Sequence, residues 1–548
     1  MSKRAAQPSL GKSSSGQKAV GQPTLIRNRI ALAAIFSAAC FSIIAARLID
    51  VMVLGAGVTG SSAPVIAHPM RADLVDRNGV LIARDLPVSD LYASPAVFWD
   101  TKEAAHDLAQ VTGAEEERLT KAFAAKHGYI PVERALSPDT REAVMRLGLP
   151  GLTFEDGYKR FYPEGRIVAH AVGQVDTDDN GVSGLELGLE RRLKEQANTA
   201  PVQLSLDLRV QYVLEHEMEQ AEHSFRAKAT AGVVLNVRTG EVLALASLPD
   251  YEPNVRTLSA GDSIRNRMTQ DVYELGSIFK IFAFTLAIEQ KTVQLDELIN
   301  VGKPLKLGNH YIHDFEHLGP LLPASMVFAD SSNIGTAQIE MRSGPTKQKP
   351  FLKKLGLLDP LKTELPEVAS PLYPRHWEEV EAATIAYGHG ISVNPLSFTA
   401  AAASVVNGGT MIRPTFLKHE EVQQGERIIS EETSRTMRQL MRLVVTDGTG
   451  TKADVPGYDV GGKTGTAEKA ENGSYAHHLL ISSFCGVFPI NDPQYLVFIM
   501  LDEPHGNKES GGFATGGAVA APAVGRVIAK IAPLLGVRRS DTVAAANP

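Results

Sequence analysis

The segment GVVLNVRTGEVLALASLP, residues 232–249, indicates the architecture of the larger part of the chain. It consists of two apolar runs rich in valine, leucine and alanine, which are separated by Arg238-Thr239-Gly240. Short apolar runs bounded by turn residues are typical of strands that are buried in a sheet. The segment therefore predicts two neighbouring strands joined at Thr239-Gly240.

The flanking sequence extends this prediction in both directions. A helical pattern runs from about Leu208 to Ala227, just before the two strands, and further strand-like segments occur before about Ala532. The middle of this region is rich in helical patterns. Strands at both ends that bracket helices indicate an α/β or α+β domain with one central sheet.

The composition is that of a folded protein. The 548 residues are 44% hydrophobic and 21% charged, with a formal net charge of -7. These values exclude a collagen-like, low-complexity or fully disordered chain, and the length predicts more than one domain. Only two cysteines occur, Cys40 and Cys485, so we expect no disulfide framework.

The charge is concentrated in a basic leader. Residues 1–29 contain six cationic side chains and no acidic one, so the remaining chain carries -13. An acidic body argues against a nucleic-acid partner, because basic residues would then lie on the folded part. Residues 30–46, IALAAIFSAACFSIIAA, are uncharged, and about 17 to 25 apolar helical residues span a bilayer.

We therefore expect a cytoplasmic tail at 1–29 and one transmembrane anchor with its juxtamembrane residues at 30–54. A cleaved signal peptide is the alternative to the anchor. After the anchor, Asn78-Gly79 lies between apolar runs, which is a strong hairpin signal, and helical patterns cover about 101–126 and 138–147. The expected divisions of the body are a non-catalytic pedestal domain at 55–200, a catalytic domain at 201–535 and a disordered tail at 536–548.

Ser277 and Lys280 form a Ser-x-x-Lys pattern at the start of the apolar stretch 278–289. The pattern also occurs at Ser9 and Ser15 in the leader, so it is weak by itself. An apolar helix is buried, and residues three apart share one of its faces. Lys280 would then approach the Ser277 hydroxyl where desolvation favours the neutral amine, which accepts a proton. A helix-capping serine with a snorkelling lysine is the alternative.

Two later segments carry residues that complement this pair. Ser331-Ser332-Asn333 precedes a helical pattern, and Lys463-Thr464-Gly465-Thr466 follows a strand-like segment. A second hydroxyl relays a proton, and an amide binds a substrate carbonyl. On a strand, Lys463 and Gly465 share one face. Glycine there admits an extended peptide along the strand edge, while the lysine and threonine side chains hold a carboxylate.

The ordered set Ser-x-x-Lys, Ser-x-Asn and Lys-Thr-Gly resembles the motifs of the penicillin-binding proteins and serine β-lactamases. The resemblance covers most of residues 68–530. The segments that resemble class B, monofunctional penicillin-binding proteins are RADLVDRNGVLIA (71–83), RFYPEGRIVAHAVG (160–173), GVSGLE (181–186), LSLDLRVQ (204–211), GEVLALASLPDYEPN (240–254), YGHGISVNPL (387–396) and GTGTKADVPGYDVGGKTGTA (448–467). Leu275, Ile278 and Asn394 depart from the usual pattern and leave the reacting groups intact.

This resemblance implies a single transmembrane helix, an elongated pedestal, and a transpeptidase-like domain whose central antiparallel sheet is flanked by helices. It also implies D,D-transpeptidation of peptidoglycan stem peptides, with Ser277 as nucleophile and Lys280 as base. The other implied roles are proton delivery by Ser331 and Lys463, substrate orientation by Asn333, carboxylate binding by Thr464 and Thr466 beside Gly465, and an oxyanion hole formed by the backbone amides of Ser277 and Thr466.

Within class B, the short tether, the moderate length and the Tyr387-Gly388 pattern favour the division-specific branch over the elongation-specific branch. Two other functions stay open. A serine β-lactamase needs a base to activate water, for which Glu364 and Glu367 are candidates, although their surroundings lack the class A pattern. A non-catalytic scaffold of the division machinery or a β-lactam sensor is the non-enzymatic alternative.

The implied partners are D-Ala-D-Ala stem peptides, β-lactams, the membrane, an FtsW-type glycan polymerase and other division proteins, without nucleic acid. The implied location is the inner membrane, with the catalytic body in the periplasm. We expect no cofactor and no metal, because His310-x-x-His313 and His477-His478 lack a nearby pattern of ligating residues. Cys485, within SSFCGVF, is expected to be a buried strand residue.

Overall fold

The computed structural model describes residues 23–49, 71–125, 127–255, 261–419, 421–471 and 474–540. The chain divides into two compact units, residues 1–67 and residues 68–548. The first unit contains helix α1 (Pro23–Ile49), whose large apolar side chains from Leu32 to Ile44 are exposed. Most of the expected tail and residues 50–54 of the expected anchor lie outside the described residues.

Among the described residues, one helix has the length and composition to cross a membrane, and it is α16 (Gly516–Leu534). More than half of this helix is buried within the second unit, as in the core helix of a folded domain. Within α1, Ala34–Ala45 is a shorter apolar helix by the same criteria.

The second unit begins with a small mixed sheet. The predicted turn at Asn78-Gly79 is confirmed, since it joins the antiparallel strands β1 (Leu74–Val75) and β2 (Leu81–Ala93). The Asp76 carboxylate accepts the backbone N–H groups of Asn78 at 2.7 Å and Val80 at 2.9 Å, and Gly79 adopts a positive φ of 86°. The sheet order is β3-β2-β1-β5, with β4 also paired to β2.

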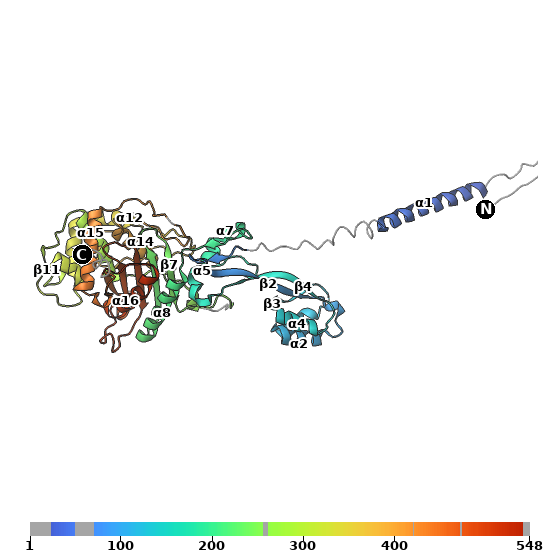
Figure 1. The fold of residues 1–548 in the computed structure, drawn as a ribbon, viewed down its shortest axis with the longest axis horizontal. Helices are drawn as coiled ribbons and strands as arrows, with labels where there is room; N and C mark the ends of the chain where they lie inside the picture. Colours follow the sequence, from blue (N-terminus) through green and yellow to red (C-terminus); the bar gives the residue numbers. More distant parts are fainter. Residues whose placement is uncertain are drawn as a thin grey trace, which may run out of the picture. The chain divides into compact units, whose positions relative to one another are not determined.

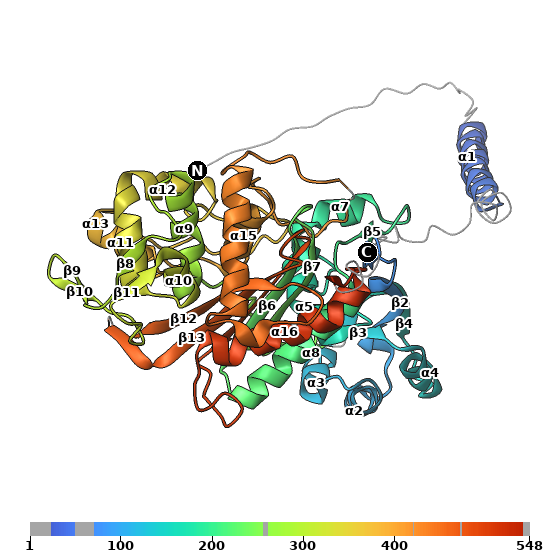
Figure 2. The same cartoon turned by 60° about the vertical axis from the view of Figure 1, so that its left-hand side comes forward.

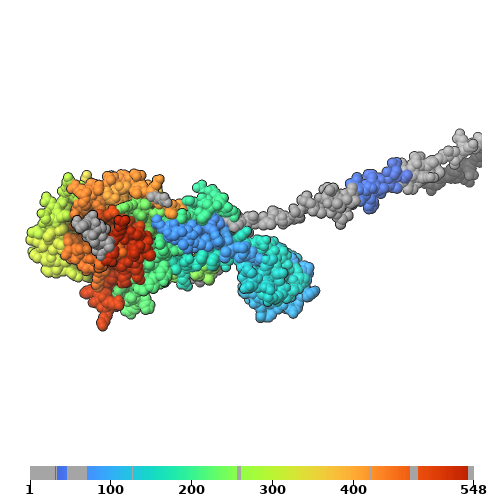
Figure 3. Space-filling view, in the orientation of Figure 1, coloured from blue at the N-terminus to red at the C-terminus, as the bar shows by residue number. Residues whose placement is uncertain are grey.

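Strands β2 and β4 (Leu152–Phe161) form a long ribbon that ends in a helical lobe (Figure 1). The lobe has its own hydrophobic core, which includes Leu91, Leu108 and Phe123. Figure 3 shows this lobe standing away from the larger body. The remaining elements of this region are η3 (Pro95–Val97), α2 (Thr101–Thr112), α3 (Glu116–Phe123), β3 (Ile130–Leu136), α4 (Pro138–Arg146), η4 (Gly165–Val168), α5 (Ala169–Val172), α6 (Gly184–Gly188), α7 (Glu190–Glu195) and β5 (Val202–Gln203).

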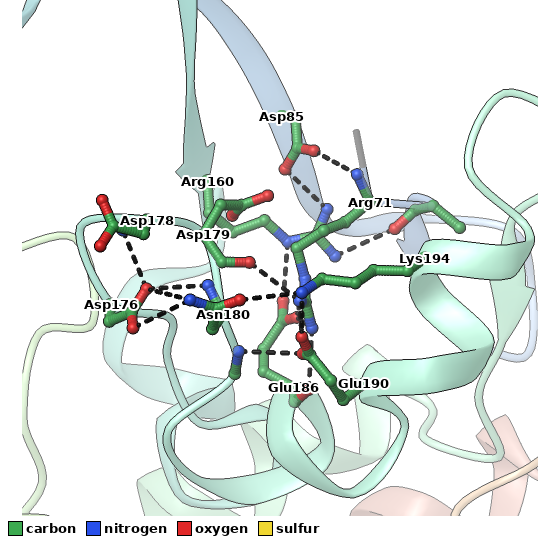
Figure 4. Close-up of polar contacts among 12 residues, drawn as sticks. Arg71, Asp85, Arg160, Asp176, Asp178, Asp179, Asn180, Glu186, Glu190 and Lys194 are labelled. Atoms are coloured by element: carbon green, nitrogen blue, oxygen red, sulfur yellow. Dashed lines mark hydrogen bonds and ion pairs between the residues drawn. The ribbon is translucent and has the colours of Figure 1, made fainter. Parts of the chain in front are cut away.

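A buried network of ion pairs holds the base of this region together (Figure 4). Arg160 donates to Glu186 at 2.7 Å and to Asp85 at 3.0 Å. Arg71 donates to Glu186 at 3.0 Å, and its backbone N–H donates to Asp85 at 2.6 Å. Three of the amino-terminal motifs quoted above each contribute to this network, so segments far apart in sequence are joined by paired charges.

The larger domain contains the expected central antiparallel sheet, in the order β12-β13-β14-β6-β7. The two strands predicted from residues 232–249 are β6 (Ala229–Asn236) and β7 (Val242–Leu248). Cys485 is fully buried on β13, as predicted. The other strands of the sheet are β12 (Gly461–Glu471), β13 (Ser474–Phe488) and β14 (Tyr495–Asp502).

Helices cover both faces of this sheet (Figure 2). Helices α8 (Leu208–Phe225) and α16 pack together on one face, while α14 and α15 pack on the other. The remaining elements are η5 (Gly261–Ile264), η6 (Gly276–Phe279), α9 (Lys280–Glu289), β8 (Leu298–Asn300), β9 (Leu305–Leu307), β10 (His310–Ile312), β11 (Leu321–Pro323), α10 (Ala324–Ala329), α11 (Asn333–Ser343), α12 (Pro345–Lys354), α13 (Glu379–Ile385), α14 (Pro395–Val406), α15 (Glu431–Thr446) and η7 (Thr451–Ala453).

One hydrophobic core runs from the base of the pedestal into the larger domain, since Leu74 and Ile82 belong to the same cluster as Phe279 and Phe398. The expected disordered tail begins too early. Ser540 donates its backbone N–H to the Gly457 carbonyl at 2.8 Å, and the Arg539 guanidinium lies over the Tyr458 ring. These contacts hold residues 536–540 against the domain, and 541–548 lie outside the described residues.

Candidate active site

Ser277 lies in the short 3-10 turn η6, which leads directly into the buried helix α9. The predicted position at the start of a buried helix is therefore confirmed. Ser277 is partly exposed, whereas Ile278, Phe279 and Lys280 are buried. The serine thus faces outward from an otherwise enclosed segment.

Two glycines hold this turn against other segments. Gly276 has a positive φ of 60°, and a Cβ there would lie 2.5 Å from the Thr466 carbonyl oxygen on β12. A Cβ on Gly388 would lie 2.1 Å from the Gly276 carbonyl oxygen. Only glycine allows such close approach of backbone to backbone. The turn that carries Ser277 therefore lies between β12 and the loop Tyr387-Gly388.

The Lys280 side chain is completely buried and is bonded to the second motif. Its ammonium group donates to the Ser331 hydroxyl at 3.0 Å, to the Asn333 side-chain oxygen at 2.8 Å and to the Ser331 carbonyl. Burial, followed by the nearby Lys463 ammonium, lowers the pKa of Lys280 well below its ordinary value. The environment therefore favours a neutral amine at this position.

Lys463 on β12 is also completely buried. It donates to the Ser331 hydroxyl at 2.9 Å, and its ammonium group lies 5.8 Å from the centre of the Phe328 ring. Burial lowers the pKa of Lys463 to about 7, although the Asp330 carboxylate partly offsets the effect. Lys463 thus changes its charge close to neutral pH.

Ser331 connects the two lysines through one hydroxyl oxygen. Its φ is 67°, a left-handed conformation that is uncommon outside glycine and that occurs often at functional sites. Asn333 begins α11, and its side-chain amide donates to the His313 carbonyl at 3.1 Å. The second and first motifs are therefore in direct contact, as the sequence predicted.

The Ser277 hydroxyl makes no hydrogen bond with Lys280 or Lys463 among the described residues. Lys280 is instead directed to Ser331 and Asn333. A protonated lysine has three donors, and all three are engaged here. A neutral amine has a lone pair in place of one N–H donor. Once Lys280 has lost its proton, this lone pair is able to accept a proton from another group.

The third motif lies on β12, the outer strand of the central sheet. The Thr464 hydroxyl lies 2.7 Å from the Thr449 hydroxyl, and the Thr466 hydroxyl accepts the Gly516 backbone N–H at 3.1 Å. A Cβ on Gly465 would lie 2.7 Å from the Leu275 carbonyl oxygen. The strand edge therefore approaches the segment before Ser277, in an arrangement that suits pairing with an extended peptide.

Sequence reasoning missed two acidic residues beside these motifs. Asp314 accepts the Ser332 hydroxyl at 2.7 Å and the Ile334 backbone N–H at 2.9 Å, which fixes the start of α11. Asp330 lies close enough to Lys463 to raise the pKa of that lysine against the effect of burial. Asp330 directly precedes the second motif, so its position in the sequence was a signal that could have identified it. Nothing in the local pattern around Asp314 distinguishes that residue.

The candidate water-activating bases of a β-lactamase are engaged elsewhere. Glu364 accepts the Thr415 hydroxyl at 2.7 Å and the Phe416 backbone N–H at 2.9 Å. Glu367 accepts the Gly184 backbone N–H at 3.0 Å. Both carboxylates therefore fix loops to other segments. Within the described residues, no cluster of three or more His, Cys, Asp or Glu side chains has the arrangement of a metal site.

Both domains of the chain resemble domains of known proteins. Residues 230–529 match the penicillin-binding protein transpeptidase domain, and residues 66–219 match the penicillin-binding protein dimerisation domain. The chain is 42% identical over 493 residues to the probable peptidoglycan D,D-transpeptidase FtsI of Caulobacter vibrioides, covering 87% of this chain and 83% of the relative. It is 27% identical over 492 residues to the peptidoglycan D,D-transpeptidase FtsI of Escherichia coli, covering 84% and 82%.

The fold resembles that of penicillin binding protein 3 from Mycobacterium tuberculosis in its crystal structure with aztreonam. The TM-score is 0.69 at 26% sequence identity, and the match covers 86% of this chain and 97% of that chain. The transpeptidase match alone spans more than half of the chain. The chain therefore belongs to the penicillin-binding proteins, in the two-domain form that joins a dimerisation domain to a transpeptidase domain.

Proposed function

We propose that this chain is a serine D,D-transpeptidase that cross-links peptidoglycan stem peptides during septal wall synthesis. The observation that carries the proposal is the contact of two buried lysines, Lys280 and Lys463, with the single hydroxyl of Ser331. Lys280 lies three residues after the partly exposed Ser277. Two names among the relatives, both FtsI, support the septal assignment. The elongation-specific branch is the alternative.

In the acylation step, the neutral Lys280 amine accepts the proton of the Ser277 hydroxyl, and the serine oxygen attacks the carbonyl of the penultimate D-alanine. The negative charge forms on the carbonyl oxygen. The backbone N–H groups of Ser277 and Thr466 are the proposed donors to that oxygen, because the glycine contact at Gly276 brings their segments together.

Collapse of this intermediate breaks the peptide bond and releases the terminal D-alanine. The leaving amine takes a proton that Lys463 supplies through the Ser331 hydroxyl, which is hydrogen-bonded to both lysines. Asn333 orients the substrate amide, and Thr464 and Thr466 bind the terminal carboxylate beside Gly465. The amino group of a second stem peptide then attacks the acyl-enzyme, the ester bond breaks, and the proton lost by that amine restores the Ser277 hydroxyl. The proton held by Lys280 returns to Lys463 through the Ser331 hydroxyl, which restores both lysines.

The exposed apolar helix α1 is the proposed membrane anchor. Its 27 residues extend about 40 Å at 1.5 Å per residue, which is sufficient to cross a bilayer core. The basic leader predicts a cytoplasmic amino terminus and a periplasmic body. An FtsW-type glycan polymerase is the proposed membrane partner. Labelling of single introduced cysteines on either side of α1 in intact cells tests this orientation.

Mass spectrometry of the full-length protein after exposure to a penicillin tests the chemistry. A long-lived adduct on Ser277, absent from Ser277→Ala, is the expected result. Rapid turnover of the penicillin would assign a β-lactamase instead, and absence of any adduct on a folded protein would assign a non-catalytic scaffold. Depletion in cells tests the branch, since filaments support septal synthesis and rounded cells support elongation.

A further inference from the structure

Glu340 on α11 is a buried acid that the proposed reaction does not use. It has no exposed surface, and neither of its carboxyl oxygens has a hydrogen-bond partner among the described residues. An isolated ionised carboxylate is very costly to bury, so such groups are usually neutral or paired. This carboxyl therefore needs an explanation of its own.

A cavity of about 10 Å³ adjoins Glu340, between α9, α11, α12 and α13. Its walls are mainly apolar and include Phe279, Ala283 and Phe351. A space of this size holds about one water molecule, provided that polar partners are present. None of the residues that line the cavity besides Glu340 is titratable, and among the described residues no charged group shifts the pKa of this carboxyl.

Gln348 is the second polar side chain on the cavity wall. Its amide donates to the Ala382 carbonyl at 2.9 Å, and its oxygen accepts the Trp377 ring N–H at 2.8 Å. These bonds leave one N–H and one lone pair of the amide available. A water in the cavity therefore has hydrogen-bonding groups from both α11 and α12 within its surroundings.

The two helices that carry the proposed catalytic groups, α9 and α11, both line the cavity. Phe279 immediately precedes Lys280, and Ala283 follows it by one helical turn. On α11, Glu340 lies seven residues after Asn333, so the two residues share one face two turns apart. The hydrogen bond from Lys280 to Asn333 joins the same two helices, α9 and α11, at the active site.

We propose that Glu340 is a neutral carboxylic acid that, with one enclosed water, fills the space between α9 and α11 and acts as a positioning residue for Lys280 and Asn333. Burial raises the pKa of Glu340 well above its ordinary value, in agreement with the neutral form. Loss of the proton to solvent would leave an uncompensated negative charge between the two helices and separate them.

This proposal predicts a pH dependence of folding stability. The folded-state pKa of Glu340 lies above its unfolded value, so its contribution is fully present below the unfolded pKa and is lost as pH rises through the folded pKa. Glu340→Gln keeps the shape and cannot ionise. We expect the difference in unfolding temperature between Glu340→Gln and the wild type to grow in favour of the variant toward alkaline pH. Parallel curves would overturn the proposal.

Infrared difference spectroscopy between the full-length wild type and Glu340→Gln measures the protonation state directly. A carbonyl stretch of a protonated carboxyl at neutral pH is expected, and a carboxylate stretch would overturn the proposal. A high-resolution crystal structure would show one ordered water between Glu340 and Gln348. A dry cavity would contradict the part of the proposal that concerns water.

The positioning role is measured by the rate of acylation with a penicillin. Glu340→Gln should acylate like the wild type at neutral pH, while Glu340→Ala should lose up to about 10²-fold, since small displacements of reacting groups have effects of that size. Equal losses in the two variants would overturn the role. The spectroscopic and unfolding experiments need no substrate, so their outcome is independent of the proposed transpeptidase activity.

Discussion

Two sites in this chain bury a pair of cationic side chains, and the partners of those cations differ completely. In the pedestal, the side chains of Arg71 and Arg160 are fully buried and form ion pairs with Glu186 and other carboxylates (Figure 4). In the catalytic domain, Lys280 and Lys463 are fully buried, and neither forms an ion pair with a carboxylate among the described residues. Their partners are hydroxyl, amide and carbonyl groups.

The pKa values of these buried cations depend on the charge of their partners. Burial alone would lower the pKa of Arg160, but the carboxylates of Glu186 and Asp85 more than offset burial and raise it. Burial lowers the pKa of both lysines, and no carboxylate compensates in full. The pedestal network therefore keeps its charges and supports structure. Both lysines release their protons more readily than an exposed lysine, and Lys463 does so with a pKa of about 7, as proton transfer requires.

We expect the largest effect from replacing a buried lysine of the catalytic domain by arginine. In Lys280→Arg, the guanidinium stays protonated and cannot accept the Ser277 proton. We expect the rate of penicillin acylation to fall by about 10²–10⁴-fold, the usual contribution of a general base. The measurement is the acylation rate constant, with thermal unfolding as the control for folding. A folded variant that acylates like the wild type would remove Lys280 from the mechanism.

Removing a cation from the pedestal should affect stability instead of chemistry. Arg160→Met leaves Asp85 and Glu186 buried with fewer partners, which costs about 3–5 kcal/mol of unfolding free energy when a buried pair is broken. Chemical denaturation measures this loss. The additional change Glu186→Gln should recover part of the loss, because it removes one of the buried charges. The folded fraction should acylate normally, and an acylation defect at unchanged stability would contradict the structural role.

The pH profile of acylation sharpens the comparison between the two lysines. Because Lys463 has a pKa of about 7 and must be protonated in the proposed step, acylation should decline as pH rises through about 7. Lys280 must lose its proton, so its ionisation makes the rate rise with pH. In Lys463→Arg the decline should disappear, since the guanidinium stays charged. A wild-type profile that is flat across pH 7 would contradict the assignment.

Local pattern was sufficient to predict much of the fold. The apolar runs around Thr239-Gly240 predicted β6 and β7, and the apolar stretch after Ser277 predicted the buried helix α9. Asn78-Gly79 predicted the hairpin because that dipeptide tolerates the positive φ of the turn. The extent of the tail was wrong because Arg539 and Ser540 find partners on a segment about eighty residues earlier, which periodicity does not reveal.

The contacts within the site were less accessible from sequence. The spacing of Ser277 and Lys280 placed them on one helix face, but the partners of Lys280 come from the segment that begins at Ser331. The direction of a long side chain depends on such distant groups. The buried carboxyl of Glu340 and the support of α11 by Asp314 had no sequence signal for the same reason.

We expect the smallest effect from breaking an exposed ion pair. Its loss of unfolding free energy is the reference against which the loss at the buried pairs is compared. Arg146 and Glu142 lie one turn apart on α4, with their charged groups 2.5 Å apart and their side chains 73% and 64% exposed. Water screens such a pair and both side chains lose rotamer freedom when they form it, so Arg146→Ala should change the unfolding free energy by less than about 0.5 kcal/mol. Denaturation under the conditions used for Arg160→Met makes the comparison direct. Equal losses in the two variants would mean that burial does not set the energy of the pedestal network, whereas a several-fold difference ties that energy to the exclusion of water around Arg160.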